Sequence, residues 1–136
     1  MGNAPSVKKV GFEDIQYIQK NGNNGIIINT LKPNEQECVI SSTISPDKEE
    51  NVINNLLKRD LMTTIIIYGR NNLDESIYQK YKDLETFGFK NVYIYPGGIF
   101  EWMCLQDIYG FEEFKTTAKE HDILKYKPIS KLNTLM

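Results

Sequence analysis

Apolar runs separated by turn residues recur along the chain and indicate alternating strands and helices. Runs rich in β-branched and aromatic residues predict strands, and the isoleucine triplets within them are typical of strands buried on both faces. These runs are residues 26–28, 63–68 and 91–95, and Val39 and Ile40 predict a further short strand. Apolar residues at helical spacing, bounded by acidic first turns and glycines, predict helices. The predicted helices cover residues 12–18, 45–57, 74–87 and 99–109.

The order of these elements predicts one α/β domain with three layers. Strands that alternate with helices favour a parallel sheet covered on both faces, here of four or five strands joined by right-handed crossovers. Residues 1–8 predict an extended arm, residues 9–110 the domain and residues 111–136 an extension. We expect this extension to pack on the domain, because it holds too many apolar side chains for a solvated tail. They are Phe111, Phe114, Ile123, Leu124 and Tyr126.

Charge and composition restrict the classes of partner. The 136 residues include 16 Lys or Arg and 18 Asp or Glu, so a net charge of −2 leaves no basic footprint for nucleic acid. One histidine, His121, and two cysteines without CxxC spacing argue against a metal site, and nothing indicates a cofactor. Two thiols without a signal peptide indicate a reduced, cytoplasmic protein, with a disulfide between Cys38 and Cys104 as the open alternative. No apolar run reaches transmembrane length.

Residues 63–102 carry several landmarks in a fixed order. An apolar strand ending at Tyr68 is followed by a loop, a helix, the sequence Gly88-Phe89-Lys90-Asn91-Val92, and then Gly97-Gly98-Ile99-Phe100-Glu101-Trp102. This stretch resembles the second half of a rhodanese-like domain, which reads as an apolar strand ending in Tyr-Cys, an active-site loop, a helix, Gly-Phe-x-x-Val and Gly-Gly-Ile-x-x-Trp. The resemblance is weaker over residues 10–46. It implies a rhodanese-like fold for residues 9–110.

The sequence departs from the family pattern at the residues that carry chemistry. The resemblance places the family's nucleophilic cysteine, which carries the persulfide, at Gly69. The family's structural Asp and Arg after an earlier strand correspond to Asn29 and Leu31, and its Gly-His-Ile histidine corresponds to Val39. Covalent sulfur transfer needs a thiolate at the loop. We therefore expect no catalytic residue in this loop.

The candidate site is the degenerate loop after Tyr68. It comprises Gly69, Arg70, Asn71, Asn72, Leu73 and Asp74. One hypothesis is that Arg70 and the loop amides bind an anion, because amides at a loop-to-helix junction form an anion nest. We favour a plain helix start instead, with Asn72 as the cap of a helix beginning at Asp74. Asp74 and Glu75 in its first turn would themselves satisfy the helix dipole and repel phosphate.

These observations favour a non-catalytic binding or adaptor module. It would contact a protein partner through the former active-site loop or the C-terminal segment. The alternative is a sulfurtransferase or phosphatase-like enzyme in which Cys38 is a relocated nucleophile. We favour an inert, buried Cys38, because reactive cysteines need an electropositive and accessible setting. A structural component of a larger assembly also stays open, since fold alone does not decide function.

The N-terminus matches a lipidation motif. Met1-Gly2-Asn3-Ala4-Pro5-Ser6 has the Gly2 and Ser6 of an N-myristoylation site, and Lys8 and Lys9 follow it. A single myristoyl chain gives marginal and reversible membrane binding, which nearby lysines strengthen on anionic membranes. We expect a cytoplasmic protein that attaches peripherally to a membrane surface through an acyl chain on Gly2.

Overall fold

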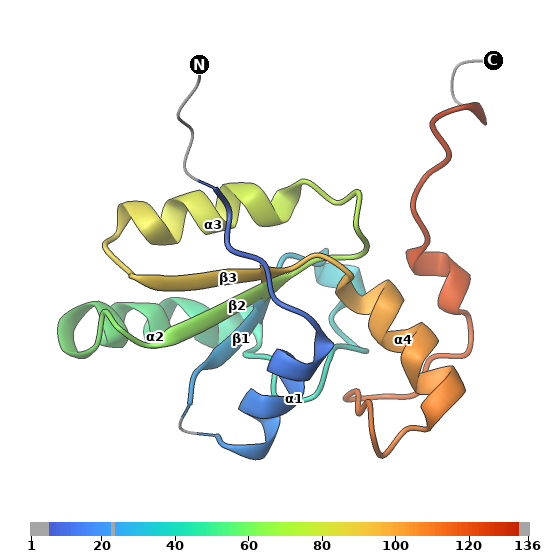
Figure 1. Cartoon of the computed structure of the whole chain (residues 1–136), viewed down its shortest axis with the longest axis horizontal. Coiled ribbons are helices and arrows are strands. Elements are labelled where there is room, and N and C mark those ends of the chain that lie inside the picture. Colours follow the sequence, from blue (N-terminus) through green and yellow to red (C-terminus); the bar gives the residue numbers. More distant parts are fainter. Residues whose placement is uncertain (1–5, 23, 134–136) are drawn as a thin grey trace.

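The computed structural model describes residues 6–22 and 24–133. Strands and helices alternate through most of this range (Figure 1). In chain order the elements are α1 (Phe12–Lys20), β1 (Ile26–Asn29), η1 (Pro33–Glu35), α2 (Pro46–Arg59), β2 (Thr64–Tyr68), α3 (Ser76–Thr86), β3 (Asn91–Tyr95), α4 (Gly98–Tyr109) and η2 (Ile123–Tyr126), where η marks a short 3-10 helix.

The sheet has the order β1-β2-β3, and all its strand pairs are parallel. Ile27 lies opposite Ile66, and Ile66 lies opposite Tyr93. This pairing joins the two isoleucine runs side by side, with the third run along the other edge of β2. The predicted α/β fold, with a parallel sheet flanked by helices, is confirmed.

The number of strands is corrected from the expected four or five to three. Beyond each edge the described chain adds only single bridges, of Thr43 to Ile27 and of Lys9 to Ile94. Residues Val39 and Ile40 form no strand. Ile40 makes one antiparallel bridge to Thr116, and a turn at Ser42, with φ of 79°, then deflects the chain before a ladder can extend.

Two apolar layers enclose the sheet, because successive strand side chains point to opposite faces. On one face Ile27 and Ile66 pack with residues of α1, α4 and the C-terminal extension, and Trp102 is fully buried among them. On the other face Ile65 and Ile67 pack with residues of α2 and α3. The helices therefore form the outer layers of a three-layer domain.

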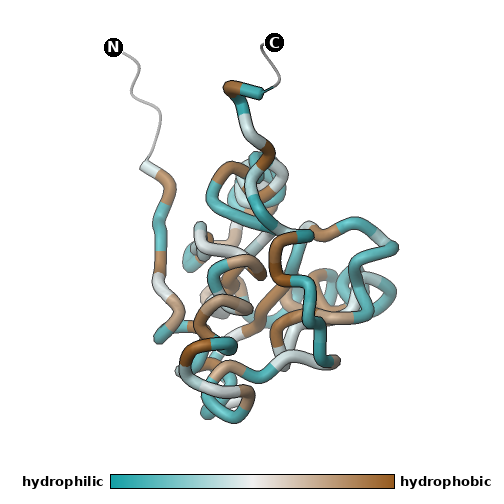
Figure 2. Tube along the Cα trace, turned by 90° about the vertical axis from the view of Figure 1, so that its right-hand side faces the viewer, coloured by the Kyte–Doolittle hydropathy of each residue, from teal (hydrophilic) through white to brown (hydrophobic). Residues whose placement is uncertain are grey.

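The chain after α4 returns to the domain and contributes to the first core layer. Phe114 stacks edge-on against Trp102 with ring centroids 5.1 Å apart. The Thr117 amide donates to the Val39 carbonyl over 2.8 Å, and Tyr126 is fully buried. From there the extension runs outward, and both described ends of the chain lie on the same side of the domain, at the top of Figure 1 and of Figure 2.

Candidate functional site

The loop between β2 and α3 begins at the carboxyl end of the central strand, where ligands bind in open α/β sheets. Two loop carbonyls accept hydrogen bonds from the start of α4. Ile99 N donates to Gly69 O and Phe100 N donates to Arg70 O, each over 2.9 Å. Gly98 makes this approach possible, since its φ is +66° and a Cβ there would lie 2.6 Å from Gly69 O. The Gly97-Gly98 pair thus fixes the first two residues of the loop.

At Gly69, space rather than backbone conformation excludes a side chain. Its φ lies outside the left-handed region. A Cβ at this position would overlap Asp74 Oδ2 and would lie 2.9 Å from Asp74 Cγ and 3.1 Å from Ile77 Cγ2. The Asp74 carboxylate therefore occupies the volume into which a residue 69 side chain would extend.

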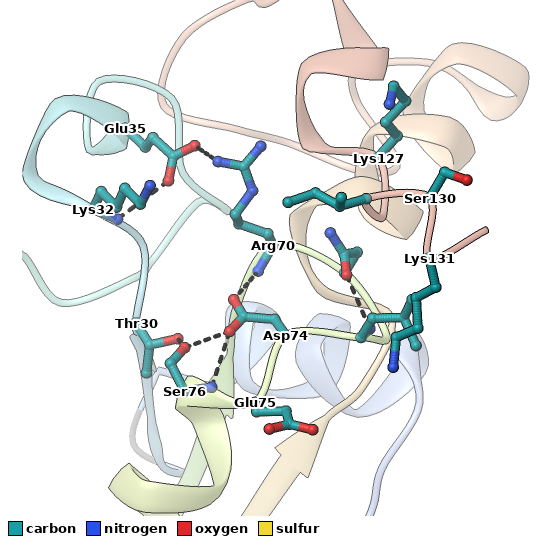
Figure 3. A pocket seen from close by; sticks show the side chains of 13 residues that line it. Thr30, Lys32, Glu35, Arg70, Asp74, Glu75, Ser76, Lys127, Ser130 and Lys131 are labelled. Atoms are coloured by element: carbon teal, nitrogen blue, oxygen red, sulfur yellow. Dashed lines mark hydrogen bonds and ion pairs between the residues drawn. The ribbon is translucent and has the colours of Figure 1, made fainter. Parts of the chain in front are cut away.

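The chain's own donors hold this carboxylate in place (Figure 3). Oδ2 of Asp74 accepts from Arg70 N over 2.9 Å, and Oδ1 accepts from Ser76 N over 3.0 Å. The Ser76 hydroxyl lies 2.6 Å from Oδ1 and 2.7 Å from the hydroxyl of Thr30 at the end of β1. Burial opposes ionisation of Asp74, but these hydrogen bonds outweigh it and lower the pKa of the carboxyl group. Asp74 is thus a stabilised anion inside the loop.

The start of α3 corrects the predicted cap. The helix begins at Ser76 rather than at Asp74, and the exposed Asn72 does not cap it. Instead Asn71 Oδ1 accepts from Leu73 N over 2.9 Å, which closes a turn, and Asp74 accepts the Ser76 amide. Because these side chains satisfy the local amides in this turn, the helical hydrogen bonds begin two residues later than the sequence pattern predicts.

Arg70 and Asn71 tie the loop to the C-terminal extension. The guanidinium of Arg70 pairs with the Glu35 carboxylate and donates to the Lys125 carbonyl. Asn71, which is only 6% exposed, donates from Nδ2 to the Tyr126 carbonyl over 2.8 Å. The positive charge of Arg70 is therefore already paired with a carboxylate.

A groove of about 790 Å³ opens beside the loop. Its walls are the end of β1 with η1, the loop with the start of α3, and the segment after η2 (Figure 3). Leu73 is 47% exposed, and Leu73 and Ile129 are the large apolar side chains in its lining. Charged groups surround them, with Lys32, Lys127 and Lys131 on two walls and Asp74 and Glu75 on the third.

Asn29 and Leu31, which depart from the family pattern, form a turn at the end of β1 that is held by side-chain hydrogen bonds. Asn29 is buried, and its Oδ1 accepts from Leu31 N over 2.9 Å and from Gln36 Nε2 over 2.7 Å. Its Nδ2 donates to Gln36 Oε1 over 3.1 Å. A neutral amide pair therefore fixes the β1 end beside the loop.

Both cysteines are free thiols, and neither belongs to the loop. Cys38 is 5% exposed, and its thiol donates to the Ala118 carbonyl over 3.3 Å. Burial raises the pKa of Cys38. Burial also raises the pKa of Cys104 on α4, and the carboxylates of Asp107 and Glu101 raise it further. The positive charge of Lys125 acts in the opposite direction on Cys38, but burial outweighs it, so neither thiol has the lowered pKa that produces a thiolate at neutral pH.

Within 6–22 and 24–133, no group of three His, Cys, Asp or Glu side chains could hold a metal ion. Over the same residues, none of the helices is both long and apolar enough to cross a bilayer. The predicted lipidation residue Gly2 lies outside the described residues.

Comparison with known proteins places the chain in a family. The family model of the rhodanese-like domain matches residues 13–104, which include the complete loop. The chain belongs to the rhodanese-like domain family. No functionally curated protein matches this rhodanese-like domain.

Solved structures share the fold. The domain is similar to the BH2092 protein of Bacillus halodurans, with 17% identity and a TM-score of 0.62 over 95% of this chain and 90% of that one. It is similar to an uncharacterized protein of Saccharomyces cerevisiae, with 19% identity and a TM-score of 0.55 over 74% of this chain and 93% of that one. It is also similar to the thiosulfate sulfurtransferase of Pseudomonas aeruginosa, with 16% identity and a TM-score of 0.59 over 88% of this chain and 23% of that one. At these identities the likeness establishes the fold alone.

Several residues of the site carry no signal in the sequence. Glu35 is distant from Arg70 along the chain, and Gln36 is an ordinary polar residue of a turn. Tyr126 looks like any apolar residue of the extension, yet its carbonyl holds Asn71. Asp74 does carry a signal, as an acid before a helix, but that signal predicts capping rather than a carboxylate in the space of a residue 69 side chain.

Proposed function

We propose that this rhodanese-like domain is a non-catalytic binding module, tethered to membranes by N-myristoylation, that contacts a protein partner beside its former active-site loop. The observation that carries the proposal is the position of the Asp74 carboxylate, which fills the space of a residue 69 side chain and accepts the Arg70 amide. A loop that catalyses sulfur transfer needs that space for a thiolate and that amide for an anion.

The charge of the loop supports the same conclusion. Thiosulfate and phosphate esters are anions, and the ionised Asp74 would repel them at the position where a reaction would take place. Arg70 could oppose this repulsion, but its guanidinium is paired with Glu35. The loop therefore offers neither a nucleophile nor an unpaired positive charge.

Cys38 is the remaining candidate nucleophile. Its thiol is buried, is bonded to the Ala118 carbonyl and has a raised pKa, so it is protonated at neutral pH. A protonated thiol attacks sulfur or phosphorus poorly, since the thiolate is the reactive form. These properties favour a structural role for Cys38 in the core.

The groove beside the loop is the candidate contact surface. Leu73 and Ile129 are exposed apolar side chains in a lining that is otherwise mostly polar or charged. A protein segment suits such a lining, because it can place an apolar side chain on these residues and polar groups around them. A photo-crosslinker at residue 73 should capture this partner in the native cell, and a crosslinker at the exposed Lys48 of α2 is the matched control.

Activity assays test the central claim. We expect the purified protein to show no thiosulfate:cyanide sulfurtransferase activity and no aryl phosphate hydrolysis above background, beside an active rhodanese as positive control. The variants Cys38→Ser and Cys104→Ser should likewise show neither activity above background. Clear turnover that disappears in Cys38→Ser would overturn the proposal and establish a relocated nucleophile.

The lipid tether has its own test. Expression with an N-myristoyltransferase should add one acyl group to the intact mass, and Gly2→Ala should lack it. A free or unmodified amino terminus on the protein from its native host would refute the tether without affecting the conclusion about catalysis.

A further inference from the structure

Charge is segregated along this chain. All eighteen acidic side chains lie between Glu13 and Asp122, together with eleven of the sixteen basic ones. The remaining five basic side chains are lysines, and they lie in residues 1–10 and 123–136, which contain no acid. A net charge of −2 therefore conceals a strongly acidic central part between two basic ends. Such a molecule has one orientation that an anionic surface attracts and others that it repels.

Both described ends of the chain lie on one side of the domain, and the chain from the first end runs along β3, where Lys9 bridges to Ile94 and the Lys8 ammonium donates to the Lys90 carbonyl. The segments at both described ends lie at the top of Figure 1, and the perpendicular view in Figure 2 agrees. Lys9 of the first segment and Lys127 of the second are exposed, and Lys127 makes no ion pair with any described residue. Lys125 contributes less, because its ammonium pairs with Glu120 over 2.6 Å.

The C-terminal segment also presents apolar side chains beside its lysines. Ile129 is 76% exposed and Leu132 is 79% exposed, and they alternate with the exposed Lys127 and Lys131. Apolar groups next to lysines are the composition by which protein segments bind the interface of an anionic bilayer, because the apolar groups enter the headgroup region while the ammonium groups meet lipid phosphates. Apolar side chains that are this exposed and lie close together mark a surface that contacts another molecule or a membrane.

We propose that residues 127–132 form a second membrane contact, which acts with the acylated N-terminal segment and selects bilayers that contain anionic lipid. This proposal rests on the acylation of Gly2 put forward under Proposed function. A single myristoyl chain holds a protein only marginally, so the second contact converts transient binding into oriented attachment. Lys127, Ile129 and Lys131 also line the groove. When Ile129 enters the bilayer it leaves the groove, so a partner bound there at the membrane surface contacts Leu73 rather than Ile129.

Vesicle sedimentation with the full, acylated chain tests the second contact. The probes are vesicles of phosphatidylcholine alone and vesicles that also contain phosphatidylserine. We expect tighter binding to the anionic vesicles and loss of that preference at high salt. Neutralising both lysines in Lys127→Gln/Lys131→Gln should weaken binding to anionic vesicles by at least about fivefold, the contribution of one lysine near the surface.

A matched control removes two exposed lysines from α2. The variant Lys48→Gln/Lys58→Gln has the same net charge, and it should change binding by less than about twofold because these lysines are remote from the proposed contact. The variant Ile129→Ser/Leu132→Ser should weaken binding to both kinds of vesicle. Equal losses in the two lysine variants would overturn the proposed contact and leave an acyl tether alone.

The remaining outcomes separate this proposal from the tether and from self-association. If the intact mass shows no acyl group, the proposed lipid tether is refuted. If the acylated protein binds both vesicle types equally, only the proposed second contact is refuted. If Ile129→Ser/Leu132→Ser abolishes a dimer in sedimentation velocity and leaves vesicle binding unchanged, the apolar residues serve a second copy of the chain, and the membrane contact is refuted.

Discussion

The carboxylate of Asp74 and a side chain at residue 69 compete for the same space, so substitutions at the two positions should be strongly coupled. In Gly69→Ala the new Cβ would overlap Oδ2 of Asp74 and force its carboxylate to move. Moving it breaks the hydrogen bonds from Arg70 N and Ser76 N. If Asp74 is first shortened in Asp74→Ala, the space is vacant, and Gly69→Ala should be tolerated.

The magnitudes follow from these contacts. Losing a carboxylate that accepts helix-start amides costs about 0.5–2 kcal/mol, and a steric overlap in a packed site costs about 1–3 kcal/mol. We therefore expect Gly69→Ala to cost about 2 kcal/mol and Asp74→Ala about 1 kcal/mol of unfolding free energy. In the double variant, Gly69→Ala should add about zero, because only the 3.1 Å contact with Ile77 remains while the alanine also restricts the unfolded chain. The coupling is then about 2 kcal/mol.

Urea unfolding of the four proteins measures this coupling. The fluorescence of Trp102 reports unfolding well, because it is the sole tryptophan and is fully buried. The pair Gly69→Ala with Glu75→Ala is the matched control, because Glu75 is exposed and its substitution leaves the Asp74 carboxylate in place. The reasoning is refuted if Gly69→Ala and Asp74→Ala add to within about 0.5 kcal/mol, the range of independent sites.

Three further predictions concern charge, the anchored extension and the thiols. Because the pKa of Asp74 is lowered in the folded state, its charge stabilises the protein above about pH 4, the unfolded value. The stability deficit of Asp74→Ala should therefore be constant near neutral pH and shrink below about pH 4, and a deficit that persists unchanged at low pH would contradict this. Asn71→Ala should cost about 2 kcal/mol and speed amide exchange in η2, and unchanged exchange there would contradict the proposed anchoring. In a Cys104→Ser background, Cys38 should react with a disulfide reagent at least about a hundredfold more slowly in the native protein than in urea, and a fast native reaction would contradict an inert thiol.

Much of this fold is determined by local sequence signals. The isoleucine runs ending at Ile28 and Tyr68 predict buried parallel strands, because β-branched side chains without polar alternation suit a sheet covered on both faces. The Gly97-Gly98 pair and the residue Gly69 are equally visible. The Gly97-Gly98 pair predicts the family, and Gly69 predicts the missing nucleophile. Both predictions depend only on which residue occupies a given position, so the sequence is sufficient to make them.

The extent of the sheet and the state of the loop depend on contacts between distant segments. No local pattern shows that the chain near Ile40 forms single bridges instead of a strand, because the turn at Ser42 and the return of Thr116 decide it. Arg70 looks like a free cation until the fold places Glu35 beside it.

Asp74 shows most clearly what only the tertiary structure decided about this protein. The sequence predicts an acidic residue at the start of a helix, and Asp74 does lie just before α3 and accepts the Ser76 amide. Whether its side chain turns outward to solvent or inward to Gly69 depends on the space left by a glycine five positions earlier and on the amides and hydroxyls around it. Those groups come from the loop, from α3 and from the end of β1, so the balance between burying a charge and satisfying it exists only once these elements are packed together.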